Sequence, residues 1–168
     1  MPQPVQYRGM SLIVPDNDTE WMEFYAHARA HRLMLRACAA CGLLRYPPTH
    51  ACPWCMDLGW AWREVSGRGT IYSYEIVHHA IQPGFKELTP YPVVLVELDE
   101  QRGAPTPDEA LRIIGDLLRP DLTPEAEANV AIGKRVSVLF QDLADHMALP
   151  QFTLAAEPPA GRVWRLPE

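Results

Sequence analysis

Four cysteines lie within eighteen residues of one another, and they constrain the fold of this chain more than any other feature. They form two C-x2-C pairs, Cys38-Ala-Ala-Cys41 and Cys52-Pro-Trp-Cys55, with ten residues between the pairs. Two such pairs joined by a short loop are typical of a tetrahedral four-thiolate metal site. Each pair predicts a tight turn whose backbone N–H groups point at the sulfurs. We therefore expect this segment to fold as a small ribbon around a metal ion.

The alternatives to a metal site fit the sequence less well. Structural disulfides are typical of exported proteins, and the first residues show no basic start followed by an apolar core. A redox C-x2-C pair would begin a helix in a βαβ unit, and none surrounds Cys52. The zinc-deaminase signature requires H-x-E, which is absent, and Ala51 rather than proline precedes Cys52. His50 is expected to be a loop residue, because four thiolates need no fifth ligand.

The spacing suits both zinc and iron, since both accept a tetrahedral set of four sulfurs. The Cys52-Pro-Trp-Cys55 turn also resembles rubredoxin, which carries iron for electron transfer. Rubredoxin, however, is little more than its metal loop, whereas more than a hundred residues follow here. We therefore expect zinc, with iron as the alternative. A zinc ion with four protein ligands has no open position for a substrate, so the predicted role is structural.

The whole chain is long enough to form a folded domain with a core. It has 168 residues, of which 48% are apolar and 21% charged, and this excludes a disordered or collagen-like chain. The best apolar run, residues 91–98, is far shorter than the roughly 20 residues that a membrane span needs. We expect a cytoplasmic protein with no membrane segment.

The first third of the chain predicts one helix. Residues 1–17 contain three prolines and no long periodic segment, so we expect a loose arm there. A helix is predicted to begin near Thr19, with Asn17 or Asp18 as its cap, and to continue to about Leu35. Three of its aromatic residues either cover the core of the domain or line a pocket or partner contact, namely Trp21, Phe24 and Tyr25.

After the cysteines the sequence is typical of β structure. Strands are predicted over residues 60–65, 70–80, 91–98, 111–118, 134–140 and 149–154. Residues 99–110 form a polar loop, and residues 122–130 a short helical turn. Five or six short strands without βαβ alternation predict a small antiparallel barrel of the OB type. The expected division is an arm and helix (1–36), a metal ribbon (37–58), a barrel (59–156) and a tail (157–168).

These features together resemble the two-part zinc-ribbon and OB-fold proteins associated with thiolases, the domain of unknown function 35 family. The resemblance covers residues 18–156 and is specific in the order of its segments, although no single segment is. The segments that carry it begin with the two cysteine pairs, continued as Cys38-Ala-Ala-Cys-Gly-Leu-Leu-Arg-Tyr-Pro-Pro48 and Cys52-Pro-Trp-Cys55. The later ones are Val65-Ser-Gly-Arg-Gly-Thr-Ile-Tyr-Ser73, Pro92-Val-Val-Leu-Val-Glu-Leu98 and Ile132-Gly-Lys-Arg-Val-Ser-Val138.

The resemblance implies a fold and a role. It implies an N-terminal helix, a four-cysteine zinc ribbon and a C-terminal OB barrel. It also implies a non-catalytic partner subunit of a thiolase-fold enzyme, such as a thiolase, a condensing enzyme or a sterol side-chain retro-aldolase. In such a hetero-oligomer the small protein would help form the acyl-CoA channel. The chain departs from the family at Met56, where glycine is frequent, and in the long 99–110 loop, which we expect to contact the partner.

The charge distribution agrees with an anionic ligand or an acidic partner surface. The net charge is −6, yet residues 24–68 hold six arginines against two acidic residues. Coenzyme A carries phosphates, which the guanidinium fork of arginine matches. Scattered, solvated arginines are the alternative interpretation. The residues predicted to face the phosphates or the partner are Arg29, Arg32, Arg36 and Arg45.

The sequence contains no recognisable catalytic set. Ser66 and Ser73 lack the G-x-S-x-G turn, and His78 and His79 end a strand, where alternation sends them to opposite faces. No phosphate-binding loop or dinucleotide fingerprint is present. We therefore expect no enzyme activity from the isolated chain. A single-stranded nucleic-acid-binding OB protein is the alternative function, although the acidic barrel half argues against it.

Overall fold

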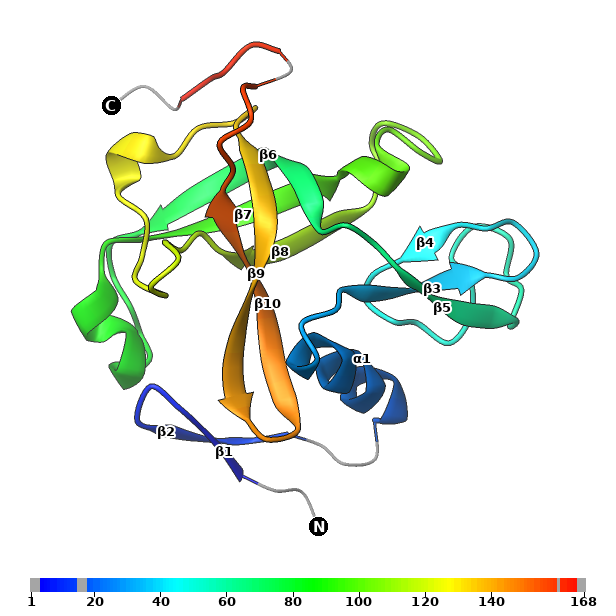
Figure 1. Cartoon of the computed structure of the whole chain (residues 1–168), viewed down its shortest axis with the longest axis horizontal. Helices are drawn as coiled ribbons and strands as arrows, with labels where there is room; N and C mark the ends of the chain where they lie inside the picture. Colours follow the sequence, from blue (N-terminus) through cyan, green and yellow to red (C-terminus); the bar gives the residue numbers. More distant parts are fainter. Residues whose placement is uncertain (1–3, 15–17, 160, 166–168) are drawn as a thin grey trace.

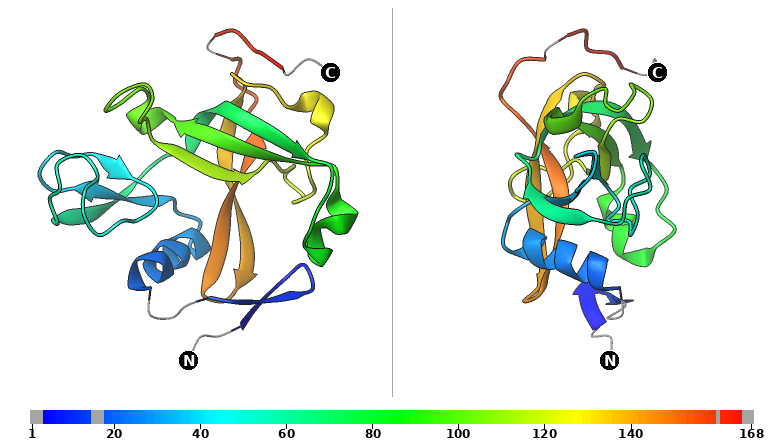
Figure 2. Two further views of the ribbon diagram at one scale, coloured as in Figure 1. Left: turned by 180° about the vertical axis from the view of Figure 1, so that it is seen from behind. Right: turned by 90° about the vertical axis from the view of Figure 1, so that its right-hand side faces the viewer.

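The computed structural model describes residues 4–14, 18–159 and 161–165. These residues form an N-terminal hairpin, one α-helix, a three-stranded sheet that carries the cysteines, and a five-stranded barrel sheet. Figure 1 shows the cysteine-bearing sheet standing beside the barrel, with the helix between that sheet and the long β9–β10 hairpin. The two further views in Figure 2 show the same arrangement. The predicted fold, mainly β with one helix, is therefore confirmed.

The N-terminal residues differ from the prediction of a loose arm. Strand β1 (Pro4–Tyr7) pairs with β2 (Met10–Ile13) as an antiparallel hairpin. Val5 and Tyr7 are buried, and the Tyr7 ring meets Phe85 edge-on at a centroid distance of 5.8 Å. Two alternating buried residues are too short a pattern to stand out in a sequence, which explains the error. Asn17 and Pro15 lie outside the described residues.

Helix α1 (Thr19–Arg29) begins where the sequence predicts. The Asp18 carboxylate accepts a hydrogen bond from the Trp21 backbone N–H at 3.3 Å and so caps the helix. The helix ends well before Leu35, which was wrongly predicted to belong to it. Leu33 and Leu35 are both buried, but they alternate along an extended segment that becomes β3. No helix in the described part of the chain is long and apolar enough to cross a membrane.

The cysteine-bearing sheet has the strand order β4–β3–β5. Its strands are β3 (Met34–Cys38), β4 (Leu44–Arg45) and β5 (Trp60–Glu64), all antiparallel. In the register, Arg36 lies opposite Arg45 on one side and Trp62 on the other. Side chains of directly opposed residues share one face of a sheet. The three side chains therefore lie in a row.

The barrel is one antiparallel sheet with the strand order β10–β9–β6–β7–β8. The strands are β6 (Arg68–Val77), β7 (Tyr91–Leu98), β8 (Arg112–Asp116), β9 (Arg135–Ala144) and β10 (Met147–Leu154). Leu117 and Phe152 form a bridge, and the Leu118 N–H donates to the Phe152 carbonyl at 2.8 Å. These contacts join the two outer strands, so the predicted antiparallel barrel is confirmed.

Strand β7 is the central strand of the barrel sheet, as its apolar run predicts. Pro92, Val94, Val96 and Leu98 are buried, while the residues between them are half-buried. Three short 3-10 segments occupy the connections: η1 (Pro83–Leu88), η2 (Asp99–Gln101) and η3 (Glu127–Asn129). The last of these is the helical turn expected over residues 122–130, and it is shorter than predicted.

Gly67, directly before β6, packs closely against strand β9. Gly67 has φ +70°, and a Cβ at this position would collide with the Val138 side chain. Gly103 has a similar φ, +63°, but open space around the same position. We expect Gly67→Ala to lower the free energy of unfolding by about 1–3 kcal/mol more than Gly103→Ala, because only the first adds overpacking to the cost of a positive φ. Urea unfolding of the two variants measures this difference, and equal midpoints would contradict it.

Candidate metal centre and arginine cluster

The four cysteine sulfurs converge at the end of the small sheet. Cys38 ends β3, Cys41 follows in the next turn, and Cys52 and Cys55 lie in the loop before β5. The Sγ atoms of Cys38 and Cys55 are 3.5 Å apart and those of Cys41 and Cys52 3.7 Å, and all four ligand atoms lie within 4.8 Å of one another. A tetrahedron with metal–sulfur bonds of about 2.3 Å has edges of about 3.8 Å. The sulfurs therefore fit a four-coordinate metal ion.

The two cysteine turns have the same backbone geometry. The N–H of Gly42 donates to the Cys38 carbonyl, and the N–H of Met56 donates to the Cys52 carbonyl, each at 3.0 Å. Gly42 has φ +76° and Met56 has φ +64°. Met56 thus adopts the left-handed conformation that glycine takes in the first turn, and it does not loosen the second.

Backbone N–H groups in both turns favour thiolates. Burial opposes ionisation of Cys52, but the N–H groups of Cys55 and Trp54 and the neighbouring sulfurs together lower the pKa of this thiol to about 6. The N–H groups of Cys41 and Ala40 likewise lower the pKa of Cys38. Burial and the neighbouring sulfurs raise the pKa of Cys41, and they raise the pKa of Cys55 to about 12. Metal binding requires thiolates, so the backbone donors prepare two of the four sulfurs, and the charge of the ion is needed to hold all four as thiolates.

His50 stands apart from the sulfurs, as the sequence predicts. Its side chain is exposed, and its Nδ1 atom lies 3.7 Å from a carboxylate oxygen of Glu20. Among the described residues, the four cysteines are the group whose ligand atoms lie close enough together to hold a metal ion. The Asp57 carboxylate lies nearer the metal centre, 3.8 Å from the Cys38 sulfur, where it also accepts the Gly59 N–H at 3.0 Å.

Three of the four predicted arginines form ion pairs within the chain, and two of these, Arg29 and Arg32, do so at the surface. Arg29 lies 3.2 Å from Asp142 and donates to the Ala144 carbonyl at 3.1 Å, which fastens the end of the helix to the β9–β10 hairpin. Arg32 donates twice to Glu64, at 2.7 and 3.0 Å. Through these contacts both side chains stabilise the fold. Their role toward a phosphate or a partner stays a prediction.

The other two arginines, Arg36 and Arg45, are 3% exposed each and lie side by side. The Arg36 guanidinium carbon lies 3.7 Å from the centre of the Trp60 ring, and its Nη1 atom is 3.6 Å from Glu20. Burial lowers the pKa of Arg36, and the positive charge of Arg45 adds to this effect. All three guanidinium nitrogens of Arg45, by contrast, are buried without a hydrogen-bond partner among the described residues.

The predicted aromatic residues of the helix pack mainly against the core. Phe24 is 2% exposed, and Trp21 and Tyr25 are half-buried beside it, with their rings stacked at 5.6 Å. Tyr46 completes this group, and burial raises the pKa of its hydroxyl to about 12. This packing agrees with the interpretation that the helix covers the core.

Sequence reasoning missed the residue that ties the ribbon to the barrel. The Gln101 side chain accepts from the Leu44 N–H at 2.7 Å and donates to the Leu44 carbonyl at 2.9 Å. Gln101 therefore pairs with the edge of β4 as a neighbouring strand would. The 99–110 loop was expected to contact a partner, and at this residue it makes an internal contact instead. Nothing in the local sequence indicates it, because the two residues are 57 positions apart.

A four-cysteine ribbon followed by a five-stranded antiparallel barrel defines a zinc-ribbon and OB-fold protein. Two family models match this chain: "ChsH2, rubredoxin-like zinc ribbon domain" over residues 26–57 and "ChsH2, C-terminal OB-fold domain" over residues 62–141. The chain belongs to this family, the DUF35 proteins of the ChsH2 type, and the resemblance seen in the sequence is confirmed.

Two relatives are named as subunits of enzymes. The chain is 33% identical over 150 residues to a "Probable enoyl-CoA hydratase alpha subunit" of Thermomonospora curvata, covering 89% of this chain and 41% of that protein. It is 31% identical over 136 residues to the "3-oxo-4,17-pregnadiene-20-carboxyl-CoA hydratase alpha subunit" of Mycobacterium tuberculosis, covering 80% and 38%. The chain therefore spans about two fifths of the length of these two relatives.

Two further relatives are matched over most of their own length. A "DUF35 domain-containing scaffold protein" of Methanocaldococcus jannaschii is 31% identical over 109 residues, which cover 64% of this chain and 67% of that protein. A solved structure, "Ltp2-ChsH2(DUF35) aldolase", is 30% identical with a TM-score of 0.67, covering 84% of this chain and 98% of the matched chain.

The geometry of the sulfurs predicts one metal ion per chain. We expect Cys41→Ser to lose the metal and to unfold the ribbon, because a closed four-ligand site contributes folding energy directly. His50→Ala is the matched control, since His50 lies in the same loop but outside the sulfur group, and it should keep the metal. Elemental analysis and thermal unfolding of both variants test this. A Cys41→Ser protein with full metal content and an unchanged melting curve would contradict it.

Proposed function

We propose that this chain is a non-catalytic partner subunit of a thiolase-fold enzyme that acts on an acyl-CoA ester. In the assembled hetero-oligomer it stabilises the enzyme and helps form the acyl-CoA channel. The observation that carries the proposal is the likeness to the matched chain of the "Ltp2-ChsH2(DUF35) aldolase" structure, 98% of which is covered at 30% identity. The thiolase fold of the partner rests on the family resemblance of the cysteine pairs and barrel strands.

The names of the other relatives support the same class. Two of them are subunits of CoA-ester hydratases, and one is a scaffold protein. Because this chain spans about two fifths of the hydratase subunits, we place the hydration chemistry of those proteins outside the shared part. His78 and His79 are both exposed just beyond the end of β6, where neither is enclosed by a pocket wall that would exclude water.

We infer that the metal is zinc and that its role is structural. Four thiolates leave no open coordination position, so an ion here holds the two cysteine turns together and does not bind substrate. Zinc also suits this chain better than iron because more than a hundred residues follow the ribbon, unlike in rubredoxin. We also propose the division into an arm and helix (1–36), a ribbon (37–58), a barrel (59–156) and a tail (157–168).

The ribbon has an exposed apolar surface suited to a partner. Trp54, Met56 and Leu58 are 54%, 72% and 60% exposed, and all three lie in or directly after the second cysteine turn. A group of large apolar side chains on one loop is characteristic of a contact that is completed by another protein. We assign this surface to the partner enzyme.

Capture of the partner tests the proposed function. We expect the tagged chain, coexpressed with a thiolase-fold enzyme of the same organism, to retain that enzyme through purification in a fixed ratio. Trp54→Ser should lower the retained amount several-fold without loss of metal, because this side chain is exposed and is not a ligand. Ile114→Ser, which removes an apolar side chain that is 59% exposed on β8, is the matched control. The proposal would be overturned if mass spectrometry found nucleic-acid-associated proteins, or no thiolase-fold enzyme, with the unsubstituted chain.

A further inference from the structure

Arg45 carries a buried charge that the described residues leave uncompensated. The side chain is 3% exposed, and each of its three guanidinium nitrogens exposes less than 1 Å² and has no hydrogen-bond partner in the described chain. Its strand neighbour is a second arginine, Arg36, whose own carboxylate contact is Glu20. An unpaired charge is costly to bury, and a like charge beside it raises that cost.

A cavity of about 420 Å³ adjoins this charge, between the ribbon and the barrel. Arg45 and Arg112 both line it, and so does Thr49, whose carbonyl accepts the Nη1 of Arg36 at 3.4 Å. The cavity therefore lies against the pair of buried arginines. Arg112 stacks on Tyr72 at 3.6 Å, and its Nε atom is also buried without a partner among the described residues.

The negative charge near this cavity is small. Among the described lining residues the one carboxylate belongs to Glu109, which is exposed and accepts the Thr106 hydroxyl at 2.8 Å. Outside the lining, Glu97 approaches Arg112 Nη2 at 3.4 Å, and Glu20 approaches Arg36. Neither of these carboxylates is paired with Arg45. The Nη1 and Nη2 atoms of Arg112 donate to the Asp108 and Pro107 carbonyls at 3.0 and 2.6 Å, so its Nε is the donor left for an anion, whereas Arg45 retains all of its donors.

We propose that this cavity binds the oxyanion group of a small organic ligand, a phosphate ester or a carboxylate, through Arg45 and Arg112. The guanidinium fork matches both groups, and charge-assisted hydrogen bonds of this kind are among the strong ones. The apolar part of the wall, which includes Tyr46, Pro47, Leu95 and Leu111, receives the body of the ligand. A bound oxyanion neutralises Arg45 and joins the ribbon to the barrel.

This inference does not rest on the proposed function. It concerns the isolated chain, and it holds whichever enzyme the chain accompanies. Loss of partner capture would leave it intact, and failure of oxyanion binding would leave the partner role intact.

The test compares small oxyanions with chloride at constant ionic strength. The full-length metal-loaded chain is titrated with inorganic phosphate, acetate and hexanoate, and its thermal midpoint is followed. We expect phosphate or a carboxylate to raise the midpoint of the wild-type chain in a saturable manner. A response to phosphate identifies a phosphate ester as the ligand, whereas a response to hexanoate above that to acetate identifies a carboxylate with an apolar body.

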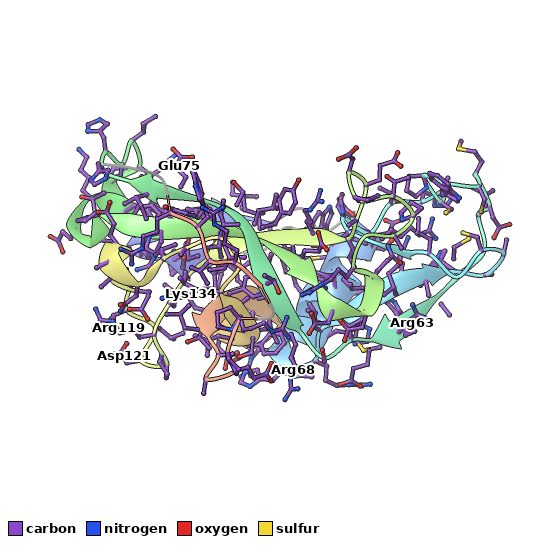
Figure 3. The ribbon with its side chains drawn as sticks, turned by 90° about the horizontal axis from the view of Figure 1, so that it is seen from above. Arg63, Arg68, Glu75, Arg119, Asp121 and Lys134 are labelled. Carbon is purple, nitrogen blue, oxygen red and sulfur yellow. The ribbon has the colours of Figure 1, made fainter. Side chains whose placement is uncertain are left out.

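Two variants isolate the contribution of Arg45. Arg45→Met should weaken the apparent affinity about tenfold or more, because the charged donors are lost. Arg63→Met removes the same charge from an exposed position of β5 and should bind as the wild-type chain does. Figure 3 shows Arg63 at the ribbon end of the molecule, distant from Lys134 and Arg119. Equal affinity in both variants, or no response of the wild-type chain to any of the three anions, would overturn the proposal.

A third variant and a second measurement guard against misfolding. Arg45→Lys keeps the charge but loses the fork, so it should fold and bind more weakly than the wild-type chain. In chloride alone, Arg45→Met should have a thermal midpoint equal to or above that of the wild-type chain, because an unpaired buried charge is removed. A lower midpoint in chloride, together with unchanged binding by Arg45→Lys, would show that Arg45 serves the fold and not a ligand.

Discussion

The convergence of four sulfurs is the constraint on which the ribbon depends. The small sheet has only a two-residue strand, β4, and two five-residue strands, which is too little to be stable alone. Its buried residues include two arginines, and its buried Leu35 and Leu44 pack into the apolar cluster shared with the helix and the barrel, so the end of the sheet that carries the cysteines has no apolar core of its own. Thiolates held by backbone N–H groups and closed by a metal supply the missing cohesion. The positions of Arg36, Arg45 and Trp62 follow from that framework.

The ribbon and the barrel are joined by backbone pairing as well as by packing. Gln101 satisfies both backbone groups of Leu44 from the barrel side, and Val65 continues the β3–β5 pairing by donating to the Leu33 carbonyl at 2.9 Å. Phe24 and Tyr46 pack between the two sheets in the same apolar cluster. Because these contacts come from different segments, the ribbon is held at several points. These contacts fix the orientation of the ribbon relative to the barrel.

The sequence predicted those parts of the fold that depend on residues close together in the chain. The cysteine spacing located the metal centre, and the apolar run over residues 91–98 located the central strand of the barrel. The end of the helix was wrong because Leu33 and Leu35 are apolar in either conformation, and only the tertiary structure decides between them. The hairpin at residues 4–13 was missed for a related reason. Its two buried side chains gain their apolar environment from Phe85 and the barrel, far along the chain.

The sequence likewise predicted only part of the candidate site. The sequence located the arginine-rich segment, but a charge count does not separate arginines that face solvent from those that face a carboxylate. The structure pairs Arg29 with Asp142 and Arg32 with Glu64, and it places Arg36 on Trp60. Arg45 differs from these three because its guanidinium has no partner among the described residues. The cavity that it lines is also lined by Arg112, 67 positions away, and the two meet there only in the folded chain.

The positive segment therefore does not act as a broad basic surface. Most of its charge is neutralised within the chain by acidic residues from the helix, the ribbon and the β9–β10 hairpin. A nucleic-acid backbone is bound through many exposed cations. Within residues 24–68, all of which the structure describes, Arg63 is the one exposed arginine without an ion pair, and Arg45 is buried. Buried arginines beside an apolar cavity suit a single, compact anionic group on an otherwise apolar molecule. The electrostatics of this fold consequently favour a small ligand at the junction of ribbon and barrel over an extended polyanion along its surface.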